Sequence, residues 1–286
     1  MVVAVIPERH PQWLMSASPS AELKVRADFA RKVVQRHIRY FSEHLGQVKH
    51  RLKADGSVVS KIDLAISRSM TRAIRGRFAA DGVISEEVVT AADTALDGYC
   101  WVLDPIDGTN NYVLGVAHCA ISLGLLWRGS PVYGVIYDHS RGVLMEGGPG
   151  FGLRESGRRI KPQHGFAEKL NLVGFHRPVD KNFRREAAAM MRDFKLRVTG
   201  SSALHLAYVA RGFLAGSVDH NVKVWDIAAG AALCAATRVS LKFRSGPLFP
   251  LTDYRSVPRK APYYAAAGPR MERRLARTLK WTNKTR

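Results

Sequence analysis

Acidic residues are scarce in this chain of 286 residues, in which Asp and Glu number 24 and Lys and Arg number 44. The formal net charge of +20 favours encounters with anions, such as phosphorylated small molecules, nucleic acid and acidic lipids. The sequence has no arginine-rich run with interleaved aromatic residues and no RNA-binding signature. We therefore interpret the excess of basic residues chiefly as solvated surface charge and keep weak nucleic-acid binding as an alternative.

Cysteine is also rare, since the chain has only Cys100, Cys119 and Cys234. They form no Cys-x-x-Cys pair and are odd in number, which argues against a disulfide framework. The pattern predicts reduced packing residues in a cytoplasmic protein. No His-Glu-x-x-His motif or Cys/His cluster is present, so the sequence gives no indication of a zinc site.

Long apolar runs are missing as well. No stretch reaches the roughly 18 to 20 apolar residues that a membrane-spanning helix needs, so we expect no membrane association. The short apolar start of the chain is interrupted by Pro7, Glu8 and Arg9 and does not resemble a signal peptide. We expect residues 1–20 to form an N-terminal extension of a cytoplasmic protein.

Hydrophobic residues make up 46% of the chain, enough for a substantial core. Apolar spacing of three and four predicts helices over residues 21–44 and 60–78, the second with Ser60 as N-cap. Strands follow in the first half, with a hairpin at Gly129-Ser130 and a glycine-punctuated strand pair around residues 144–160. Beyond residue 170, strands and helices alternate with short links, which predicts a layered α/β sandwich.

The stretch WVLDPIDGTNN, residues 101–111, carries the most informative pattern. Trp-Val-Leu is typical of a buried strand, and Asp104-Pro and Asp107-Gly are pairs that end strands. One such pair alone indicates only a turn. Two carboxylates at a strand end suit a hard cation, and the Gly108-Thr109 amides and hydroxyl suit a phosphate.

Further acidic residues accompany this stretch. Glu86 and Glu87 follow a short apolar strand, Asp226 stands at the start of a helix of small residues, and Asp63 follows Ser60. Taken singly, the glutamates could form a solvated turn, Asp226 a helix cap, and Asp63 an exposed first-turn residue. Their combination with Asp104 and Asp107 favours a metal site.

The segments GVISEE, WVLDPIDGTNNY and VWDIAAGAAL, in this order and spacing, resemble the motifs of the inositol monophosphatase family of magnesium-dependent, lithium-sensitive phosphatases. KADGSVVSKID and VTGSSALHLAYVARG resemble its N-terminal motif and its Gly-Ser-rich helix. The resemblance covers roughly residues 20–280. It implies an αβαβα sandwich, one phosphatase domain over residues 21–286 with halves 21–160 and 161–286, and a homodimer. No sequence feature identifies the dimer interface.

The resemblance also implies roles for individual residues. Glu86, Asp104 and the Ile106 carbonyl would bind a first Mg²⁺; Asp104, Asp107 and Asp226 a second; and Glu86 with Asp63 a weaker third. Thr109 Oγ and Asp63 would orient the attacking water. Phosphate or substrate contacts are implied for the following residues: Gly108, Thr109, Asn110, Gly200, Ser201, Ser202 and Asp219.

The chemistry fits these residue types. Neighbouring metal ions neutralise a phosphate monoester, activate water and stabilise the departing oxygen, and oxygen-only ligands favour Mg²⁺ over zinc. We therefore expect a Mg²⁺-dependent phosphomonoesterase acting on inositol 1-phosphate or a similar small phosphorylated substrate. Histidinol phosphate, fructose 1,6-bisphosphate and 3′-phosphoadenosine 5′-phosphate stay open. So does a nucleic-acid- or ribosome-associated accessory role on the same fold.

Two departures from the family pattern concern the leaving group. The acid expected to meet a substrate hydroxyl is the shorter Asp219, with Lys223 nearby. The family's common Ala-Gly-Gly after the last helix of this region is Ala236-Thr237-Arg238. We interpret Arg238 as a surface residue, with attraction of a more anionic substrate as the alternative.

Overall fold

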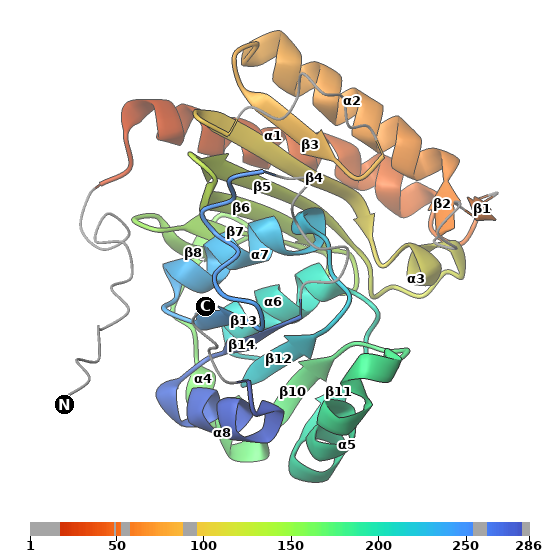
Figure 1. Cartoon of the computed structure of the whole chain (residues 1–286). Helices are drawn as coiled ribbons and strands as arrows, with labels where there is room; N and C mark the ends of the chain where they lie inside the picture. The colour runs from red at the N-terminus through yellow and green to blue at the C-terminus, as the bar shows by residue number, and fades with distance from the viewer. Residues whose placement is uncertain (1–17, 49, 53–57, 88–95, 254–261, 282–286) are drawn as a thin grey trace.

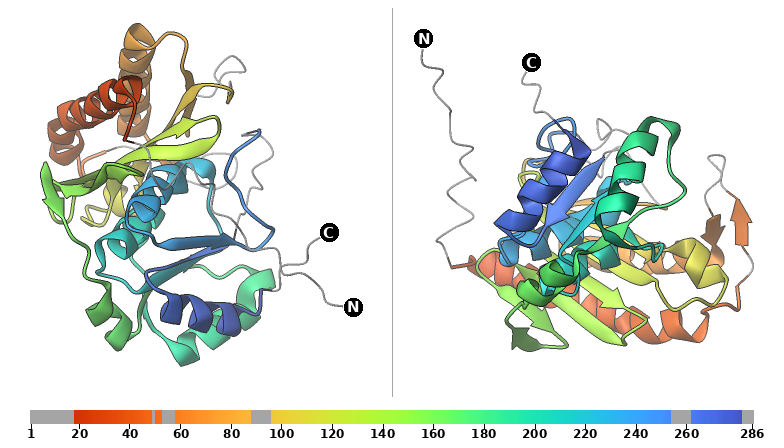
Figure 2. Two further views of the ribbon diagram at one scale, coloured as in Figure 1. Left: turned by 90° about the vertical axis from the view of Figure 1, so that its left-hand side faces the viewer. Right: turned by 90° about the horizontal axis from the view of Figure 1, so that it is seen from below.

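The computed structural model describes residues 18–48, 50–52, 58–87, 96–253 and 262–281. Lys53 and Asp55 of the N-terminal motif lie outside these residues. Five layers alternate between helices and sheets (Figures 1 and 2). The layered αβαβα sandwich expected from the sequence is confirmed.

The outer helices of the first layer are α1 (Ala21–Glu43) and α2 (Lys61–Arg77). The central layer contains α6 (Ser202–Arg211) and α7 (Val224–Ala236). The far outer layer contains α4 (His164–Leu170), α5 (Arg184–Asp193) and α8 (Pro269–Leu279). A short helix, α3 (Thr109–Val113), follows the carboxylate-rich strand, and a 3₁₀ turn (Lys181–Phe183) precedes α5.

The first sheet has seven strands in the order β3-β4-β5-β6-β7-β8-β9, parallel between β3 and β4 and antiparallel elsewhere. Their bounds are β3 Gly82–Ser85, β4 Tyr99–Asp107, β5 Ala120–Trp127, β6 Ser130–Asp138, β7 Val143–Gly148, β8 Gly152–Glu155 and β9 Arg158–Ile160. The prediction of two strands around residues 144–160 is therefore wrong, because two turns divide this segment into three strands, β7, β8 and β9.

The second sheet has five strands in the order β11-β10-β12-β14-β13. β10 pairs in parallel with β11 and β12, and β14 is antiparallel to β12 and β13. Their bounds are β10 Leu172–Phe175, β11 Lys195–Arg197, β12 Gly216–Asp219, β13 Ser240–Phe243 and β14 Tyr263–Ala266. A separate hairpin pairs β1 His50–Leu52 with β2 Val58–Ser60.

Local sequence signals explain several element boundaries. Ser60 begins α2 through a capping box, in which its hydroxyl accepts from Asp63 N and the Asp63 carboxylate accepts from Ser60 N. The β5–β6 hairpin is confirmed, but its turn is Arg128-Gly129, one residue earlier than predicted. Both turn residues have positive φ, 47° and 74°, as a two-residue turn of this twist requires.

Apolar packing joins the layers. One cluster lies between the α1/α2 layer and the seven-stranded sheet, a second surrounds α6 and α7, and a third lies beneath α5 and α8. α7 approaches the first sheet closely at Gly134, where an added Cβ would lie 2.3 Å from Ala229 O. The three cysteines are free and buried, as predicted. No helix among the described residues is long and apolar enough to cross a membrane.

Candidate metal centre

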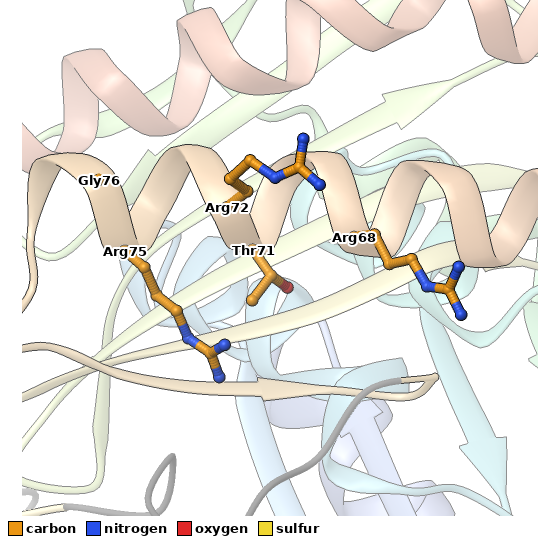
Figure 3. Close-up of a pocket in the computed structure, with 5 residues that line it drawn as sticks. All are labelled: Arg68, Thr71, Arg72, Arg75 and Gly76. Atoms are coloured by element: carbon orange, nitrogen blue, oxygen red, sulfur yellow. The ribbon is translucent and has the colours of Figure 1, made fainter.

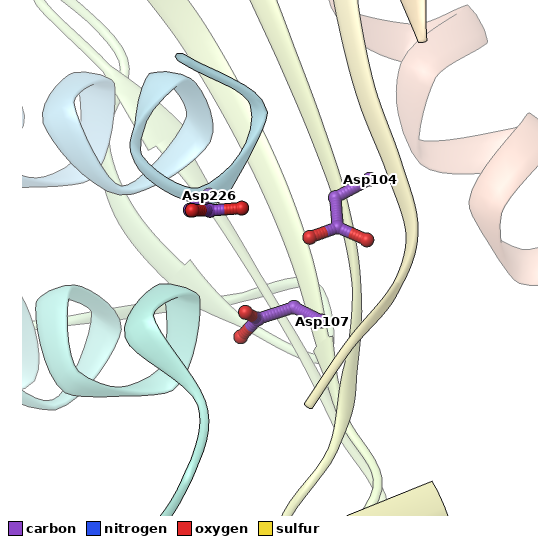
Figure 4. A group of neighbouring side chains, drawn as sticks. All are labelled: Asp104, Asp107 and Asp226. Atoms are coloured by element: carbon purple, nitrogen blue, oxygen red, sulfur yellow. The ribbon is translucent and has the colours of Figure 1, made fainter. Parts of the chain in front are cut away.

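A bulge at the end of β4 brings two carboxylates to one side of the strand. Asp104 and Asp107 are three positions apart, so in a regular strand their side chains would point to opposite faces. Asp104 lies opposite Ser122 and Asp107 opposite Ala120, so β4 holds one more residue than β5 between these pairs. Pro105, which has no N–H for the ladder, lies in this irregular segment. Both carboxylates therefore point into the same space (Figure 4).

The third carboxylate comes from the central helical layer. Asp226 is the third residue of α7, and its Oδ2 accepts a hydrogen bond from Lys223 N at 2.7 Å. Oxygen atoms of Asp104, Asp107 and Asp226 lie within 4.8 Å of one another. The chain thus brings three acidic residues into one cluster, called here the carboxylate group, with Asp104 and Asp107 buried and Asp226 partly exposed.

Hydrogen bonds fix these side chains without neutralising them. Asp104 Oδ1 accepts from Ile106 N at 3.0 Å, and Asp107 Oδ2 accepts from the Ser201 hydroxyl and from Ala203 N. No described Lys or Arg forms an ion pair with any of the three. Among the described residues, no donor bonds Asp104 Oδ2 or Asp226 Oδ1. Oxygen-only donors with uncompensated charge fit a hard divalent cation.

Burial and mutual repulsion raise the pKa values of the group. Burial is the main cause of raising the pKa of Asp107 to about 7 and of raising those of Asp104 and Asp226 well above the ordinary range. The charge of Glu86 raises the pKa of Asp104 further, and that of Asp107 does the same for Asp226. Bound cations would stabilise the ionised carboxylates.

Glu86, which directly follows β3, and Asp63, in the first turn of α2, lie near enough to Asp104 for their charges to raise its pKa. The backbone N–H of Glu86 donates to Leu103 O on β4 at 3.1 Å. Asp63 is fully buried, and burial raises its pKa to about 6. Its Oδ2 accepts from Ser60, whereas its buried Oδ1 has no partner among the described residues. Metal ligation by Glu86 and Asp63 stays a prediction.

The turn after β4 depends on a glycine. Gly108 has φ 83°, and an added Cβ would lie 3.0 Å from His118 O and 3.1 Å from Gly200 O. The Thr109 hydroxyl donates to Ile106 O at 2.9 Å. The hydroxyl predicted to orient water and the carbonyl predicted to bind a metal ion are therefore adjacent.

The start of α6 approaches this turn from the other half of the chain. Gly200 has φ 83°, and the next two hydroxyls donate to carboxylates: Ser201 to Asp107 and Ser202 to Asp219 Oδ2 at 2.6 Å. The predicted phosphate contacts of Gly200, Ser201 and Ser202 stay predictions; the Ser201 hydroxyl bonds a member of the carboxylate group, and the Ser202 hydroxyl bonds Asp219.

Two residues near the site were not selected from the sequence. The first is Asn111, which donates from Nδ2 to His118 O and to Thr199 O, both at 2.7 Å. Its neighbour Asn110, the predicted substrate contact, is exposed. Asn111 thus joins the turn after β4 to the segment before α6. The second residue is His176, whose Nδ1 lies 3.6 Å from Asp219 Oδ2. No local sequence signal distinguishes either residue.

Two basic hollows lie away from the carboxylate group. One of about 520 Å³ lies along α2 (Figure 3) and is lined by Arg68, Thr71, Arg72, Arg75 and Gly76. The other, of about 1020 Å³, lies between α5 and α8, and Arg185, Arg192, Arg274, Arg277 and Lys280 contribute to its lining. Arg238 is exposed, as the surface interpretation predicts.

The model of the inositol monophosphatase family matches residues 19–247, and this match includes every carboxylate described above. The chain belongs to the inositol monophosphatase family. Within this family, the chain is 30% identical over 202 residues to a fructose-1,6-bisphosphatase/inositol-1-monophosphatase of Aquifex aeolicus, covering 67% of this chain and 75% of the relative. It is 32% identical over 189 residues to the Nus factor SuhB of Pasteurella multocida, covering 63% and 69%.

Solved structures of the inositol monophosphatase family share the fold. The Thermotoga maritima IMPase superimposes with a TM-score of 0.77 at 24% identity, covering 90% of this chain and 97% of that one. An IMPase/NADP phosphatase complexed with Mg²⁺ and phosphate gives a TM-score of 0.76 at 18% identity, covering 93% and 100%. At these identities the likeness shows the fold.

Proposed function

We propose that this chain is a Mg²⁺-dependent phosphomonoesterase that hydrolyses inositol 1-phosphate or a similar polyol or sugar phosphate. The observation that carries the proposal is the convergence of Asp104, Asp107 and Asp226, which have no cationic partner among the described residues. Histidinol phosphate, fructose 1,6-bisphosphate and 3′-phosphoadenosine 5′-phosphate are alternative substrates of the same reaction class. The name of the Aquifex aeolicus relative supports this class.

The proposed donors to two or three Mg²⁺ ions are the Ile106 carbonyl and the carboxylates of Asp63, Glu86, Asp104, Asp107 and Asp226. When bound, such ions neutralise the phosphate and increase the acidity of water. The protein contributes their placement: the β4 bulge aims Asp104 and Asp107 into one space, and α7 supplies Asp226. The hydrogen bonds from Ser201 and Lys223 hold these carboxylates before substrate arrives.

The remaining residues would orient phosphate and water. Gly108 lacks a side chain where the backbone must approach a phosphate, and its amide and that of Thr109 are the proposed donors. Asp63 Oδ1, buried without a partner among the described residues, is the proposed acceptor of a hydrogen bond from water. Thr109 Oγ1 is the second proposed contact of that water.

The test is phosphate release with and without Mg²⁺ from the four candidate substrates. We expect release only with Mg²⁺ and its loss in Asp104→Asn, with the preferred substrate naming the activity. Folded protein that binds Mg²⁺ but releases no phosphate from any of the four would contradict the proposed activity on these compounds.

A nucleic-acid-associated accessory role is the second candidate function. The basic linings of the α2 and α5–α8 hollows favour it, and relatives named Nus factor SuhB are consistent with it. RNA affinity that falls steeply with salt and survives Asp104→Asn would support this role. RNA affinity that is lost together with Mg²⁺ binding would argue against it.

The oligomeric state and compartment complete the proposal. We propose a homodimer in the cytoplasm, on the basis of the family resemblance and of the three free, buried cysteines. Sedimentation equilibrium at micromolar concentration tests the dimer directly.

A further inference from the structure

Asp219 lies next to the carboxylate group but is separated from solvent. It ends β12 and is fully buried. Ser201 and Ser202, adjacent at the start of α6, donate to Asp107 and Asp219 respectively, so the start of one helix contacts both carboxylates. The charge of Asp219 also contributes to the raised pKa of Asp226. The surroundings of Asp219 therefore belong to the space beside the proposed phosphate site.

Both oxygens of Asp219 already accept hydrogen bonds from the protein. Oδ2 accepts from Ser202 Oγ at 2.6 Å, and Oδ1 accepts from Asn221 N at 3.0 Å. An ionised carboxylate has about four lone-pair directions, and protein donors take two of those of Asp219. Asp219 therefore braces the start of α6 through Ser202, and its contact with a substrate hydroxyl stays a prediction.

His176 is a partly exposed polar side chain beside Asp219. β10 and β12 are parallel neighbours in which Phe175 pairs with Val218, so the residues that follow, His176 and Asp219, lie side by side at the carboxyl edge of the sheet. His176 Nδ1 lies 3.6 Å from Asp219 Oδ2, and its side chain is 24% exposed. Carboxyl edges of parallel strands are common ligand positions.

Two other histidines near Asp219, His205 and His220, are buried and form hydrogen bonds within the protein. His205 Nε2 bonds Thr199 Oγ1, and His220 Nε2 accepts from Asp180 N. Burial lowers the pKa of His205 to about 4 and also lowers that of His220, which favours the neutral form of both imidazoles. Among the described residues, only His176 lies within ion-pair distance of Asp219.

We propose that His176 contacts the leaving group of the substrate and selects phosphate monoesters whose alcohol carries a second anionic group, a carboxylate or another phosphate. The inference rests on the proposed phosphatase function. Asp219, beside this position, already accepts from Ser202 and Asn221, whereas His176 Nε2 has no hydrogen-bond partner among the described residues.

The charges beside His176 point to the same substrate class. The chain continues into Arg177, which is exposed and forms no ion pair or hydrogen bond with described residues. Asp180, the acid of the same loop, has Oδ1 bonded to Asn182 N. An anion meeting this edge encounters the side chains of His176 and Arg177, on a chain whose formal net charge is +20. Fructose 1,6-bisphosphate and 3′-phosphoadenosine 5′-phosphate fit this selection better than inositol 1-phosphate.

The test compares matched substrates with Mg²⁺ present. Glycerol 2-phosphate and 2-phosphoglycerate differ by one carboxylate, and fructose 1-phosphate and fructose 1,6-bisphosphate differ by one phosphate. We expect the wild-type protein to favour the more anionic member of at least one pair in kcat/KM.

His176→Ala should reduce that preference about tenfold, the size of one charge-assisted hydrogen bond, mainly through KM. His176→Lys should retain it. His37→Ala, on the outer helix α1, is the matched control and should retain it as well.

The outcomes separate the two claims. Equal kcat/KM within both pairs, or a preference unchanged by His176→Ala in folded protein, overturns the role of His176 and leaves the phosphatase function standing. Mg²⁺-dependent release from inositol 1-phosphate but from none of these four compounds overturns the role of His176 alone, and no release from any of the five overturns both. A preference lost in His176→Ala and retained in His176→Lys supports the proposal, and the pair that shows it distinguishes carboxylate from phosphate.

Discussion

The hydroxyl of Ser201 donates to the carboxylate of Asp107 across 94 positions of the sequence, from the start of α6 to the end of β4. The same hydroxyl accepts from Leu204 N at 3.2 Å and so caps α6. One side chain therefore begins a helix of the central layer and fixes a proposed metal ligand that belongs to the first sheet. The two halves of the chain meet at this contact.

Removing that hydroxyl should affect stability and metal binding together. Ser201→Ala removes an N-cap, which costs about 1 kcal/mol of unfolding free energy. It also leaves Asp107 less firmly oriented, and the loss of such a supporting contact weakens metal affinity roughly 10- to 100-fold. Urea unfolding and Mg²⁺ titration measure the two effects. Ser201→Thr, which keeps the hydroxyl, is the control, and unchanged Mg²⁺ affinity in Ser201→Ala would contradict the positioning role.

Neutralising a carboxylate of the group should abolish turnover without unfolding the protein. Asp226→Asn and Asp107→Asn each remove one charged ligand, and we expect a loss of about a thousandfold or more in kcat, because metal ions supply several kcal/mol of transition-state stabilisation. Circular dichroism should show an intact fold. Near-normal turnover in either variant would exclude the metal assignment. Asp253→Asn, outside the carboxylate group, is a matched control.

Gly108 should not tolerate a side chain. Its φ of 83° and the 3.0 Å approach of an added Cβ to His118 O both oppose Gly108→Ala. We expect about 1–2 kcal/mol of destabilisation from the left-handed backbone and a large loss of phosphate release. Gly76→Ala is the matched control: nothing lies within 4 Å of its added Cβ, and as a helical position it should gain up to about 1 kcal/mol.

The metal-free protein should lose stability as pH rises. Burial raises the pKa of Asp63 to about 6 and that of Asp107 to about 7, whereas an unfolded Asp titrates near 3.9. The folded state therefore holds protons that the unfolded state has released, and this stability is lost between pH about 4 and about 7.

Thermal melting in EDTA at pH 5 and pH 8 measures this effect. The fall in Tm should be smaller in Asp107→Asn, which removes one of the titrating groups. Because metal binding requires ionised carboxylates, Mg²⁺ should raise Tm more at pH 8 than at pH 5. A Tm that does not fall with pH in EDTA would contradict the raised pKa values.

The local motifs were readable in the sequence because short-range physics sets them. Ser60 with Asp63 predicted a capping box, and the structure has one. WVLDPIDGT predicted a buried strand that ends at a carboxylate pair and a glycine turn, and β4 with Gly108 confirms it. The α/β alternation after residue 170 predicted the second sheet.

Other features were missed because their local signals are weak. The helix α4 and the strand β13 are short, and the turns that divide residues 143–160 into three strands follow glycines that also fit a single hairpin. Asn111 and His176 gain their importance only from partners 88 and 43 positions away, in the segment before α6 and at the end of β12.

By itself, the sequence determined which residues are acidic, which segments alternate with a helix or strand period, and which family motifs they resemble. The tertiary structure decided that Asp104, Asp107 and Asp226 share one space, because a one-residue bulge and the packing of α7 set their directions. It also decided that Asp219 is buried and lies beside His176, because the register of β10 against β12 places the two strand ends side by side. Direction and burial arise from long-range packing, which no local pattern encodes.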